Sequence, residues 1–317
     1  MRVRFGYVAK ALGIPNGSPN QSITLKKLKK VEEQPEQLDL LRRILAHNLE
    51  ATRQVLYYNQ SRRINVYRFS SRMVPLASHP VTKGWDYIGE FRSQWHEIGA
   101  FVTTHGVRVS AHPDHLTLLS TPKKDVLAAA LRELAYHGAM FDAMGLPYAP
   151  QFVLHAGGVY KNKASSLERF VKEYQQLPDN IRLRIIIEND DKSYDASDVL
   201  PLCQKLGCPM VFDLHHHQCL QRGENLGELW ADIVATWGEH TPKIHLSSAK
   251  SAKDPRPHAA YVHIDDFLPF LHIAKELDRD FDVMLEAKEK DRALAVLMKD
   301  LEKAKGIKRL EPASIVL

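Results

Sequence analysis

Short runs of β-branched and aromatic residues alternate with longer amphipathic segments along the 317 residues of the chain. The runs are nearly continuous in apolar residues, which is typical of strands buried on both faces of a parallel sheet. We expect eight strands, at residues 3–8, 64–70, 107–112, 152–155, 185–188, 210–213, 244–247 and 283–286. Helical spacing of apolar residues predicts eight helices between them, at residues 38–58, 87–104, 124–144, 167–177, 196–206, 226–237, 267–277 and 292–304.

Strict alternation of eight strands with eight helices predicts an α/β protein with a single (β/α)8 TIM barrel over residues 1–317. A doubly wound open sheet is the alternative. Asp195 before one predicted helix, and Gly145 and Gly207 after two others, are typical start and stop signals. Outside this pattern we expect a long mobile loop at 13–30, a long basic loop at 247–261 and a surface tail at 308–317.

The composition is that of a soluble globular protein, with 44% hydrophobic and 26% charged residues. No apolar run is long enough to span a bilayer, and the N-terminal residues lack the pattern of a signal peptide. The three cysteines form no C-x-x-C pair, so we expect reduced thiols and a cytoplasmic protein without a membrane partner. The net charge of +5 is a weak bias toward anionic partners such as nucleic acid.

Six of the eight predicted strands carry a histidine or a carboxylate at or near their carboxyl ends. In a barrel these ends form one rim, where so many unpaired polar groups would be costly without a cation. Imidazole and carboxylate groups suit Zn, Mn or Fe. The sequence therefore predicts a metal centre, with two further histidines close to the rim. Its candidate ligands are His112, His155, Glu188, Asp213, His216, His245, His258 and Glu286.

Eight candidate ligands are more than one metal ion needs. Glu188, Asp213, His245 and Glu286 are sufficient for one site. With Glu188 as a bridge, His112 and His155 can complete a second site, and His216 and His258 can serve a third. Two or three clustered cations suit phosphodiester hydrolysis, because a cation acidifies the attacking water and stabilises charge on the phosphate oxygens.

The order and spacing of several short motifs resemble those of the UV damage endonucleases over almost the whole chain. The motifs are Arg4-Phe5-Gly6-Tyr7, Arg68-Phe69-Ser70-Ser71, Ser78-His79, Ala111-His112-Pro113-Asp114, Leu154-His155-Ala156-Gly157-Gly158, Glu188-Asn189-Asp190-Asp191, Asp213-Leu214-His215-His216-His217, Lys243-Ile244-His245-Leu246-Ser247-Ser248 and Leu285-Glu286-Ala287-Lys288-Glu289-Lys290. The resemblance implies a TIM barrel related to endonuclease IV. It also implies cleavage of the phosphodiester immediately 5′ to a UV photoproduct, such as a cyclobutane dimer or a 6-4 photoproduct, and at abasic sites.

The family resemblance also implies a cofactor and roles for particular residues. It implies two or three divalent cations, manganese in the first place and Zn²⁺, Co²⁺ or Mg²⁺ as alternatives, bound at the same eight positions. His79 and Lys243 fall at active-site positions. Glu188, as the bridging ligand, is the third candidate catalytic residue. Lys243 has two interpretations. In the first it is a cation, or a modified lysine, near the scissile phosphate. In the second it is a lysine at the strand entrance that pairs with a carboxylate.

The implied partner is UV-damaged double-stranded DNA. We expect no obligate protein partner, and we expect a monomeric enzyme that is nucleoid-associated when it is bound to DNA. His115 and Leu116 occupy the stretch that resembles the family's lesion-probing loop, where some relatives have glutamine and an aromatic residue. Tyr7, at the first strand end, is a candidate for stacking on a base; a buried tyrosine is the alternative. Candidate phosphate contacts on the rim are Arg72, Lys161, Lys163, Lys192, Lys250, Lys253 and Arg256.

Two other functions are compatible with parts of this pattern. A sugar isomerase or epimerase with a single metal ion would need only Glu188, Asp213, His245 and Glu286. The additional histidines and the basic loops argue against it. A DNA-damage binding protein without catalysis is the second alternative, and the complete set of candidate ligands argues against that. One metal ion per chain would favour the isomerase, and two or three would favour the nuclease.

Overall fold

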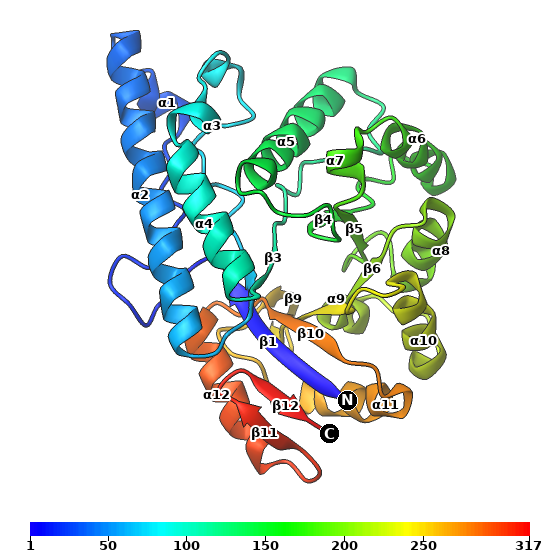
Figure 1. The fold of residues 1–317 in the computed structure, drawn as a ribbon. Helices are drawn as coiled ribbons and strands as arrows, with labels where there is room; N and C mark the ends of the chain where they lie inside the picture. The colour runs from blue at the N-terminus through cyan, green and yellow to red at the C-terminus, as the bar shows by residue number, and fades with distance from the viewer.

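Eight parallel strands form a barrel in the computed structural model, which describes residues 1–317. Helices surround the strands in a ring (Figure 1). The barrel strands are β1 (Arg2–Val8), β2 (Val66–Arg68), β3 (Arg108–Ser110), β4 (Phe152–His155), β5 (Ile185–Glu188), β6 (Met210–Asp213), β7 (Lys243–Leu246) and β10 (Phe281–Leu285). Each overlaps one of the predicted strands, and the predicted TIM barrel is confirmed.

Neighbouring strands pair in the order β1-β2-β3 and β4-β5-β6-β7-β10-β1, all in parallel. Between β3 and β4 there is only one isolated bridge, from Ala111 to Phe152. Two backbone hydrogen bonds cross this seam, from Ala111 N to Gln151 O (2.9 Å) and from Val153 N to Ala111 O (3.0 Å). These links join β3 and β4, which would otherwise be the two edges of the sheet, so the barrel is nearly closed and the open sheet is excluded.

The helices of the chain follow the predicted pattern with small shifts of their ends. Asp195 forms a capping box at the start of α8, and Gly207 ends that helix with a φ of 64°. The predicted helix at 87–104 is divided into α3 and α4 at Phe91. The helical elements are α1 (Leu25–Leu28), α2 (Gln34–Ser61), η1 (Pro80–Thr82), α3 (Tyr87–Glu90), α4 (Arg92–Thr104), α5 (Lys124–Ala143), α6 (Lys163–Gln175), α7 (Asp179–Arg182), α8 (Ala196–Leu206), α9 (Leu214–Cys219), α10 (Leu226–Thr236), η2 (Ile264–Asp266), α11 (Leu268–Leu277) and α12 (Lys290–Lys303).

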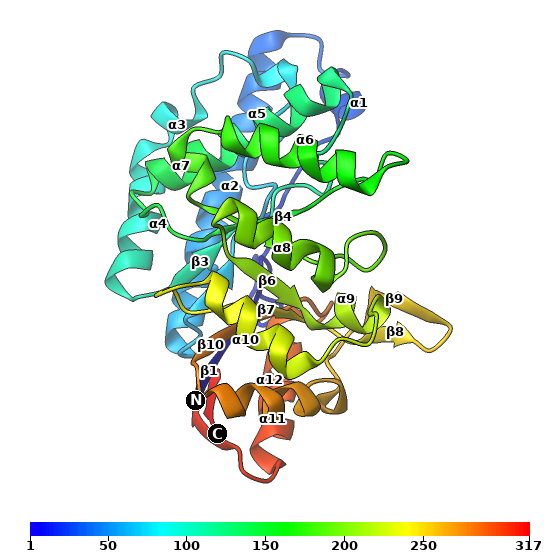
Figure 2. The ribbon, with the colours of Figure 1, turned by 90° about the vertical axis from the view of Figure 1, so that its right-hand side faces the viewer.

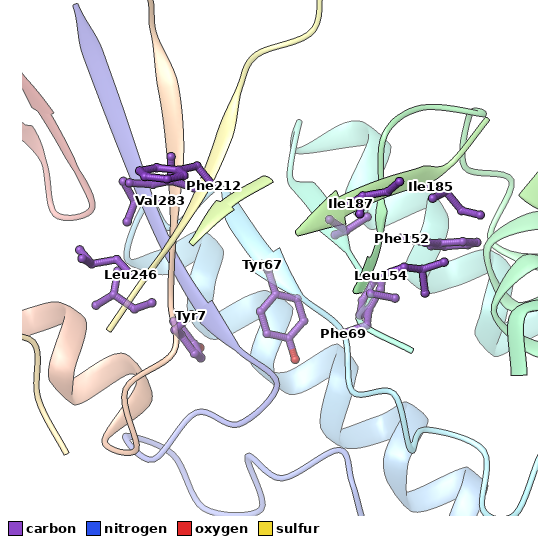
Figure 3. Close-up of a cluster of buried hydrophobic side chains, with 14 of the residues drawn as sticks. Tyr7, Tyr67, Phe69, Phe152, Leu154, Ile185, Ile187, Phe212, Leu246 and Val283 are labelled. Carbon is purple, nitrogen blue, oxygen red and sulfur yellow. The ribbon is translucent and has the colours of Figure 1, made fainter. Parts of the chain in front are cut away.

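Alternate residues of the strands point outward and pack against the helices, because successive side chains of a strand lie on opposite faces. Figure 3 shows part of this layer. Tyr7 lies on β1 and Tyr67 on β2, Phe69 directly follows β2, and Phe152 lies on β4. It belongs to one cluster of 71 buried hydrophobic residues that reaches from Val3 to Ile315. A core of this extent holds the ring of helices in place around the barrel.

The interior of the barrel is apolar on one side and charged on the other. Val153, Ile186 and Val211 project inward from β4, β5 and β6 and form a small cluster with Trp237. On the opposite side, buried Asp282 of β10 accepts hydrogen bonds from other strands: Arg4 Nε (2.7 Å) and Arg108 Nη1 (2.6 Å). The lower part of the barrel is thus filled without help from the residues of the rim above it.

The prediction of a surface tail at 308–317 is wrong. These residues form a hairpin of β11 (Lys308–Glu311) and β12 (Ser314–Val316), and β12 pairs with β1 in the antiparallel direction. The pairing is possible because the short strand β2 contacts only Gly6–Val8 of β1 and leaves Arg2–Arg4 without a neighbour on that side. Ile315 is fully buried there.

The two long loops also contain regular structure. The basic loop forms a hairpin of β8 (Ala249–Ser251) and β9 (Asp254–His258), which projects from the barrel (Figure 2). The loop at 13–30 contains α1. Its start is fixed by the Asp291 carboxylate, which accepts hydrogen bonds from Leu12 N (2.6 Å) and Gly13 N (3.0 Å). No helix in the structure is both long and apolar enough to cross a membrane.

We predict that Ile315→Ala lowers the free energy of unfolding by about 2–5 kcal/mol, because it leaves a cavity between β12 and the core. Chemical denaturation with a structural probe would measure this. Leu310→Ala is the matched control, since Leu310 is exposed on β11, and its effect should stay within about 0.5 kcal/mol. Equal unfolding midpoints for both variants would contradict the packed hairpin.

We also propose that residues 1–317 are one folding unit, and therefore expect a single unfolding transition.

Candidate metal centre

The candidate ligands lie together at the carboxyl ends of the barrel strands. His155, Glu188 and Asp213 are the last residues of β4, β5 and β6. His245 lies within β7, and Glu286 directly follows β10. These residues alternate with outward-facing core residues, so the same two-residue period that packs the helices points the polar side chains into the barrel mouth.

Three groups of candidate ligands converge on Glu188, which belongs to all of them. Within each group one ligand atom per residue lies within 4.8 Å of the others. The groups are His112–His155–Glu188, Glu188–Asp213–His216 and Glu188–His245–Glu286. Glu188 has two carboxylate oxygens, so it is the residue that can bridge neighbouring cations.

The two oxygens of Glu188 face different groups. Oε2 lies 3.2 Å from His112 Nε2 and 3.6 Å from His155 Nε2. Oε1 lies 2.6 Å from His245 Nδ1 and 3.7 Å from His216 Nδ1. The carboxylate is thus placed between two pairs of imidazoles, in the arrangement that a bridging ligand requires.

Seven of the eight predicted ligands belong to these groups, and His258 does not. Its Nδ1 is 2.9 Å from the Glu286 carbonyl oxygen and 3.8 Å from Glu286 Oε2. Its ring centroid is 6.1 Å from that of His216. His258 therefore borders the centre at the end of β9, close to two of the other candidate ligands.

Backbone carbonyls fix the orientation of three of the histidines. The Nδ1 atoms of His112, His216 and His258 lie 2.9–3.0 Å from the carbonyl oxygens of Pro113, Asn189 and Glu286. A carbonyl can only accept a hydrogen bond, so Nδ1 carries the proton and Nε2 is left with a lone pair in the neutral ring. Metal-binding histidines are commonly oriented in this way.

The charge states of the ligands also fit cations. Burial and the neighbouring Glu286 carboxylate raise the pKa of Glu188, which is 1% exposed, well above its usual range. Burial lowers the pKa of His112 to about 4 and that of His155 to about 3, so both rings are neutral near pH 7. Asp213 Oδ2 and His155 Nδ1 are buried without a hydrogen-bond partner. A divalent cation would satisfy the crowded carboxylates and use the available lone pairs.

Arg68 is a residue of this centre to which the sequence assigned no role. Its Nη1 donates to Glu286 Oε1 (2.5 Å), and its Nη2 lies 2.6 Å from His245 Nε2. Burial would raise the pKa of Glu286, but the Arg68 guanidinium together with the neighbouring histidines outweighs burial and holds it well below the usual range. The sequence does contain a signal for this position, since Arg68 is the last residue of β2 and the alternation of side chains along the strand points it into the barrel.

Lys243 lies inside the barrel, below the rim. It is fully buried, and its Nζ has no hydrogen-bond partner. Burial, followed by the nearby Arg108 guanidinium, lowers its pKa well below the usual range. The expected alternative, a pair with a carboxylate at the strand entrance, is not formed, because the Asp282 carboxylate near it is bound by two arginines.

Two other predicted residues lie outside the groups of ligands. His79 is half-buried before η1, where its Nδ1 accepts a hydrogen bond from Val81 N (3.0 Å). Tyr7 is fully buried, and its hydroxyl donates to Asn59 Oδ1 (2.6 Å). Its ring faces the helices and offers no surface on which a base can stack, so the alternative of a buried tyrosine describes its position.

The predicted probing loop is exposed next to a cavity. The side chain of His115 is 78% exposed, and Leu116 is 63% exposed. The loop is held by Asp114, whose Oδ1 accepts a hydrogen bond from Leu116 N (3.0 Å). Arg72 and Leu116 line a cavity of about 490 Å³ between the loops that follow β2 and β3. An exposed apolar tip on a fixed turn is suited to contact a large partner.

The basic residues of the β8–β9 hairpin are exposed, and two of them have partners. Lys253 makes no ion pair. Lys250 is 3.4 Å from Asp254, and Arg256 forms a bidentate pair with Asp191 (2.7 and 2.9 Å). His215 Nε2 contacts the Arg256 carbonyl oxygen (3.0 Å), which connects the hairpin to α9 beside the centre.

Comparisons with known proteins agree on one family. The family model of the UV-endonuclease UvdE matches residues 3–316. A UV DNA damage endonuclease of Bacillus cereus (strain B4264) is 41% identical over 318 residues, which cover 99% of each chain. The crystal structure of SacUVDE has a TM-score of 0.84 at 29% identity and covers 95% of this chain and 98% of that one. Endonuclease IV from Thermus thermophilus shares the fold, with a TM-score of 0.55 at 15% identity over 95% of this chain and 100% of that one.

We predict that the affinity of the metal-free protein for Mn²⁺ rises with pH between about pH 6.5 and about pH 9. Burial lowers the pKa of His216, but Asp213 and Glu188 outweigh burial and raise it to about 9. Below that pH a cation has to displace the His216 proton, and raising the pH removes this competition. Isothermal titration calorimetry at several pH values would measure the effect.

His216→Gln is the control for this measurement, because glutamine cannot be protonated in this range and keeps a polar side chain. The variant should bind Mn²⁺ with a shallower dependence on pH. An affinity of the wild-type protein that is constant, or that falls as the pH rises, would contradict the assignment of His216 as a ligand.

Proposed function

The chain belongs to the UV-endonuclease UvdE family, and from this membership we propose that it hydrolyses the phosphodiester immediately 5′ to UV photoproducts in double-stranded DNA. Cyclobutane dimers and 6-4 photoproducts are the proposed lesions, with abasic sites as further substrates. The observation that carries the proposal is the convergence of three groups of candidate ligands on the Glu188 carboxylate. Such a centre suits several divalent cations next to one another, which is the arrangement that phosphodiester hydrolysis uses.

The proposed cofactor is two or three divalent cations, with Mn²⁺ first and Zn²⁺, Co²⁺ or Mg²⁺ as alternatives. When bound, they would supply an acidified water and stabilise negative charge on the phosphate. Glu188 would bridge two of them, and its burial keeps both oxygens directed at the neighbouring ligands. Arg68 would hold Glu286 in place. We propose no side-chain nucleophile.

Two catalytic assignments rest on the family resemblance and on position. Lys243 is proposed to act from below the centre, since its buried Nζ has no partner and lies on the same inward face of β7 as His245. A modified lysine at this position would also fit the resemblance. His79 is proposed to reach the substrate from the loop after β2, where its Nε2 is not used by the backbone contact of Nδ1.

Recognition of damaged DNA is assigned to the exposed loops of the rim. We propose that Leu116, with His115 beside it, inserts at the lesion, because an apolar side chain can wedge between base steps and damaged bases are weakly paired. Arg72, Lys250, Lys253 and Arg256 are the proposed phosphate contacts. The buried Tyr7 is left out of this interface. The enzyme is proposed to act as a monomer.

UV-irradiated and unirradiated supercoiled plasmid would test the proposed function. Metal-loaded protein should convert irradiated plasmid to nicked circles, and chelator should abolish the reaction. Glu188→Gln should keep the fold but lower the rate by more than roughly 100-fold, the upper end of losses seen when residues supporting a metal ligand are changed. Mapping of the new ends tests the 5′ position.

Four results would contradict the proposal or a part of it. Nicks of equal number in both plasmids would exclude a preference for damage. A protein that holds a single metal ion and cuts neither plasmid would favour the sugar isomerase, whereas a protein that binds irradiated DNA without cutting it would favour the non-catalytic binder. Wild-type activity of Glu188→Gln would exclude the bridging role of Glu188.

A further inference from the structure

Two lysines lie at the ends of the neighbouring strands β1 and β10, beside the candidate metal centre. The strands pair in parallel, with Tyr7 opposite Leu285. Lys10 follows β1 by two residues, and Lys290 begins α12 four residues after the candidate ligand Glu286. Figure 1 shows β1 and β10 side by side. The register of the strands therefore brings the two lysines to the same part of the rim.

Both lysines are presented by unfavourable backbone conformations. Ala9 has a φ of 58°, and Lys10 N donates to Val8 O (2.7 Å), which closes a three-residue turn. Lys290 itself has a φ of 47°. Residues with a Cβ rarely adopt positive φ, and such conformations persist only where the surrounding structure enforces them. Strain of this kind is concentrated at functional sites, and here it occurs at two adjoining turns.

Direct contacts fix the two turns to each other. Asp291, next to Lys290, is buried and accepts hydrogen bonds from Leu12 N (2.6 Å) and Gly13 N (3.0 Å) in the loop after Lys10. Arg292 Nη2 donates to Leu12 O (3.0 Å). The start of α12 and the loop after β1 thus form one assembly, and the positions of the two lysines are set relative to the metal centre.

The ammonium group of Lys290 has no direct partner in the chain. The residue is half-buried, and its ammonium makes no hydrogen bond or ion pair. It also stands at the first position of α12, where the helix dipole disfavours a cation. Burial lowers the pKa of Lys290, the Glu286 carboxylate opposes this, and the positive charges of Arg68 and Lys10 act in the same direction as burial.

The carboxylate that acts most strongly on Lys290 is that of Glu286, and it is already committed. It accepts a hydrogen bond from Arg68 (2.5 Å) and belongs to one of the groups of candidate metal ligands. Arg68 and Lys290 therefore both act on a carboxylate that the centre itself uses, and Lys10 adds a further positive charge near Lys290. A further anion at this position would relieve the repulsion between Lys10 and Lys290, and the only anion that the proposed reaction brings to the rim is the DNA backbone.

We propose that Lys10 and Lys290 together bind one phosphate of the DNA strand that is cut, next to the metal centre. This inference rests on the proposed function and names the residues that position its substrate. Two ammonium groups on fixed turns would hold the phosphodiester in register with the ligands around Glu188, because charge-assisted contacts to phosphate position a nucleic acid without reading its sequence. A role limited to neutralising Glu286 is the competing explanation.

Binding of a non-hydrolysable duplex tests the proposal without requiring cleavage. The probe is a fluorescent duplex with one cyclobutane dimer, in which the linkage 5′ to the dimer is a methylene phosphonate that keeps its negative charge. Fluorescence anisotropy with the Mn²⁺-loaded protein would be measured between about 50 and about 200 mM salt. The variants are Lys10→Met, Lys290→Met, both together and Lys290→Arg. Lys299→Met, an exposed position on the same helix, is the matched control.

We expect Lys290→Met to weaken binding about tenfold, as for the removal of a charge-assisted hydrogen bond, and to reduce the slope of log affinity against log salt by about 0.9 for each phosphate that is no longer neutralised. The double variant should bind the duplex at most about tenfold more weakly than each single variant, since both lysines share one phosphate. Lys290→Arg should retain most of the affinity, Lys299→Met should match the wild type, and the metal content of all variants should be equal.

Unchanged affinity and slope in both Met variants would overturn the inference, even if the wild type cuts damaged plasmid. An altered metal content with an unchanged salt slope would overturn it as well, in favour of neutralisation of Glu286. If the expected losses of binding occur but the wild type never nicks irradiated plasmid, the phosphate contact of the two lysines stands and the nuclease proposal fails. A wild type that does not bind the duplex would overturn both.

Discussion

The carboxylate of Glu188 is the interaction on which the arrangement of the rim depends. It is buried at the end of β5, and its two oxygens face imidazoles that come from the segment after β3, from β4, from β7 and from α9. A buried carboxylate without a cation is costly, and here Glu286 and Asp213 lie close to it as well. The ligands are thus brought together by the barrel and not by local sequence, and their mutual repulsion is the physical reason to expect cations there.

The interior of the barrel supports this centre in two different ways. On the side of β4, β5 and β6 an apolar cluster with Trp237 fills the space below the rim. On the other side the ion pairs of Asp282 and the contacts of Arg68 fill it with charge. Buried ion pairs add little stability, but they fix geometry, and Arg68 connects this charged layer directly to Glu286 and His245.

Much of the fold and of the ligand set could be predicted from the sequence because both follow from one-dimensional patterns. Apolar runs mark buried parallel strands, and their polar last residues, such as His155, Glu188 and Asp213, must meet at one rim. The same two-residue period places Tyr7 outward and Arg68 inward. The place of a residue at a strand end does not by itself show whether its side chain points into the barrel or out of it. The sequence therefore suggests Tyr7 as a DNA contact and assigns no role to Arg68.

Other features depend on contacts that the pattern does not contain. The C-terminal hairpin docks because β2 is too short to cover the first residues of β1, which only the register reveals. The adjacency of Lys10 and Lys290 depends on the pairing of the first strand with the last one and on the contacts of Asp291. Residues that are about 280 positions apart in the chain are joined by barrel closure, and no local signal reports it.

Crystals grown with Mn²⁺, with diffraction recorded at the manganese absorption edge, would show directly whether Glu188 bridges cations. We expect two or three anomalous peaks at the carboxyl ends of the strands, with at least two of them coordinated by the Glu188 carboxylate. A single peak, or several peaks of which none contacts Glu188, would contradict that bridging role.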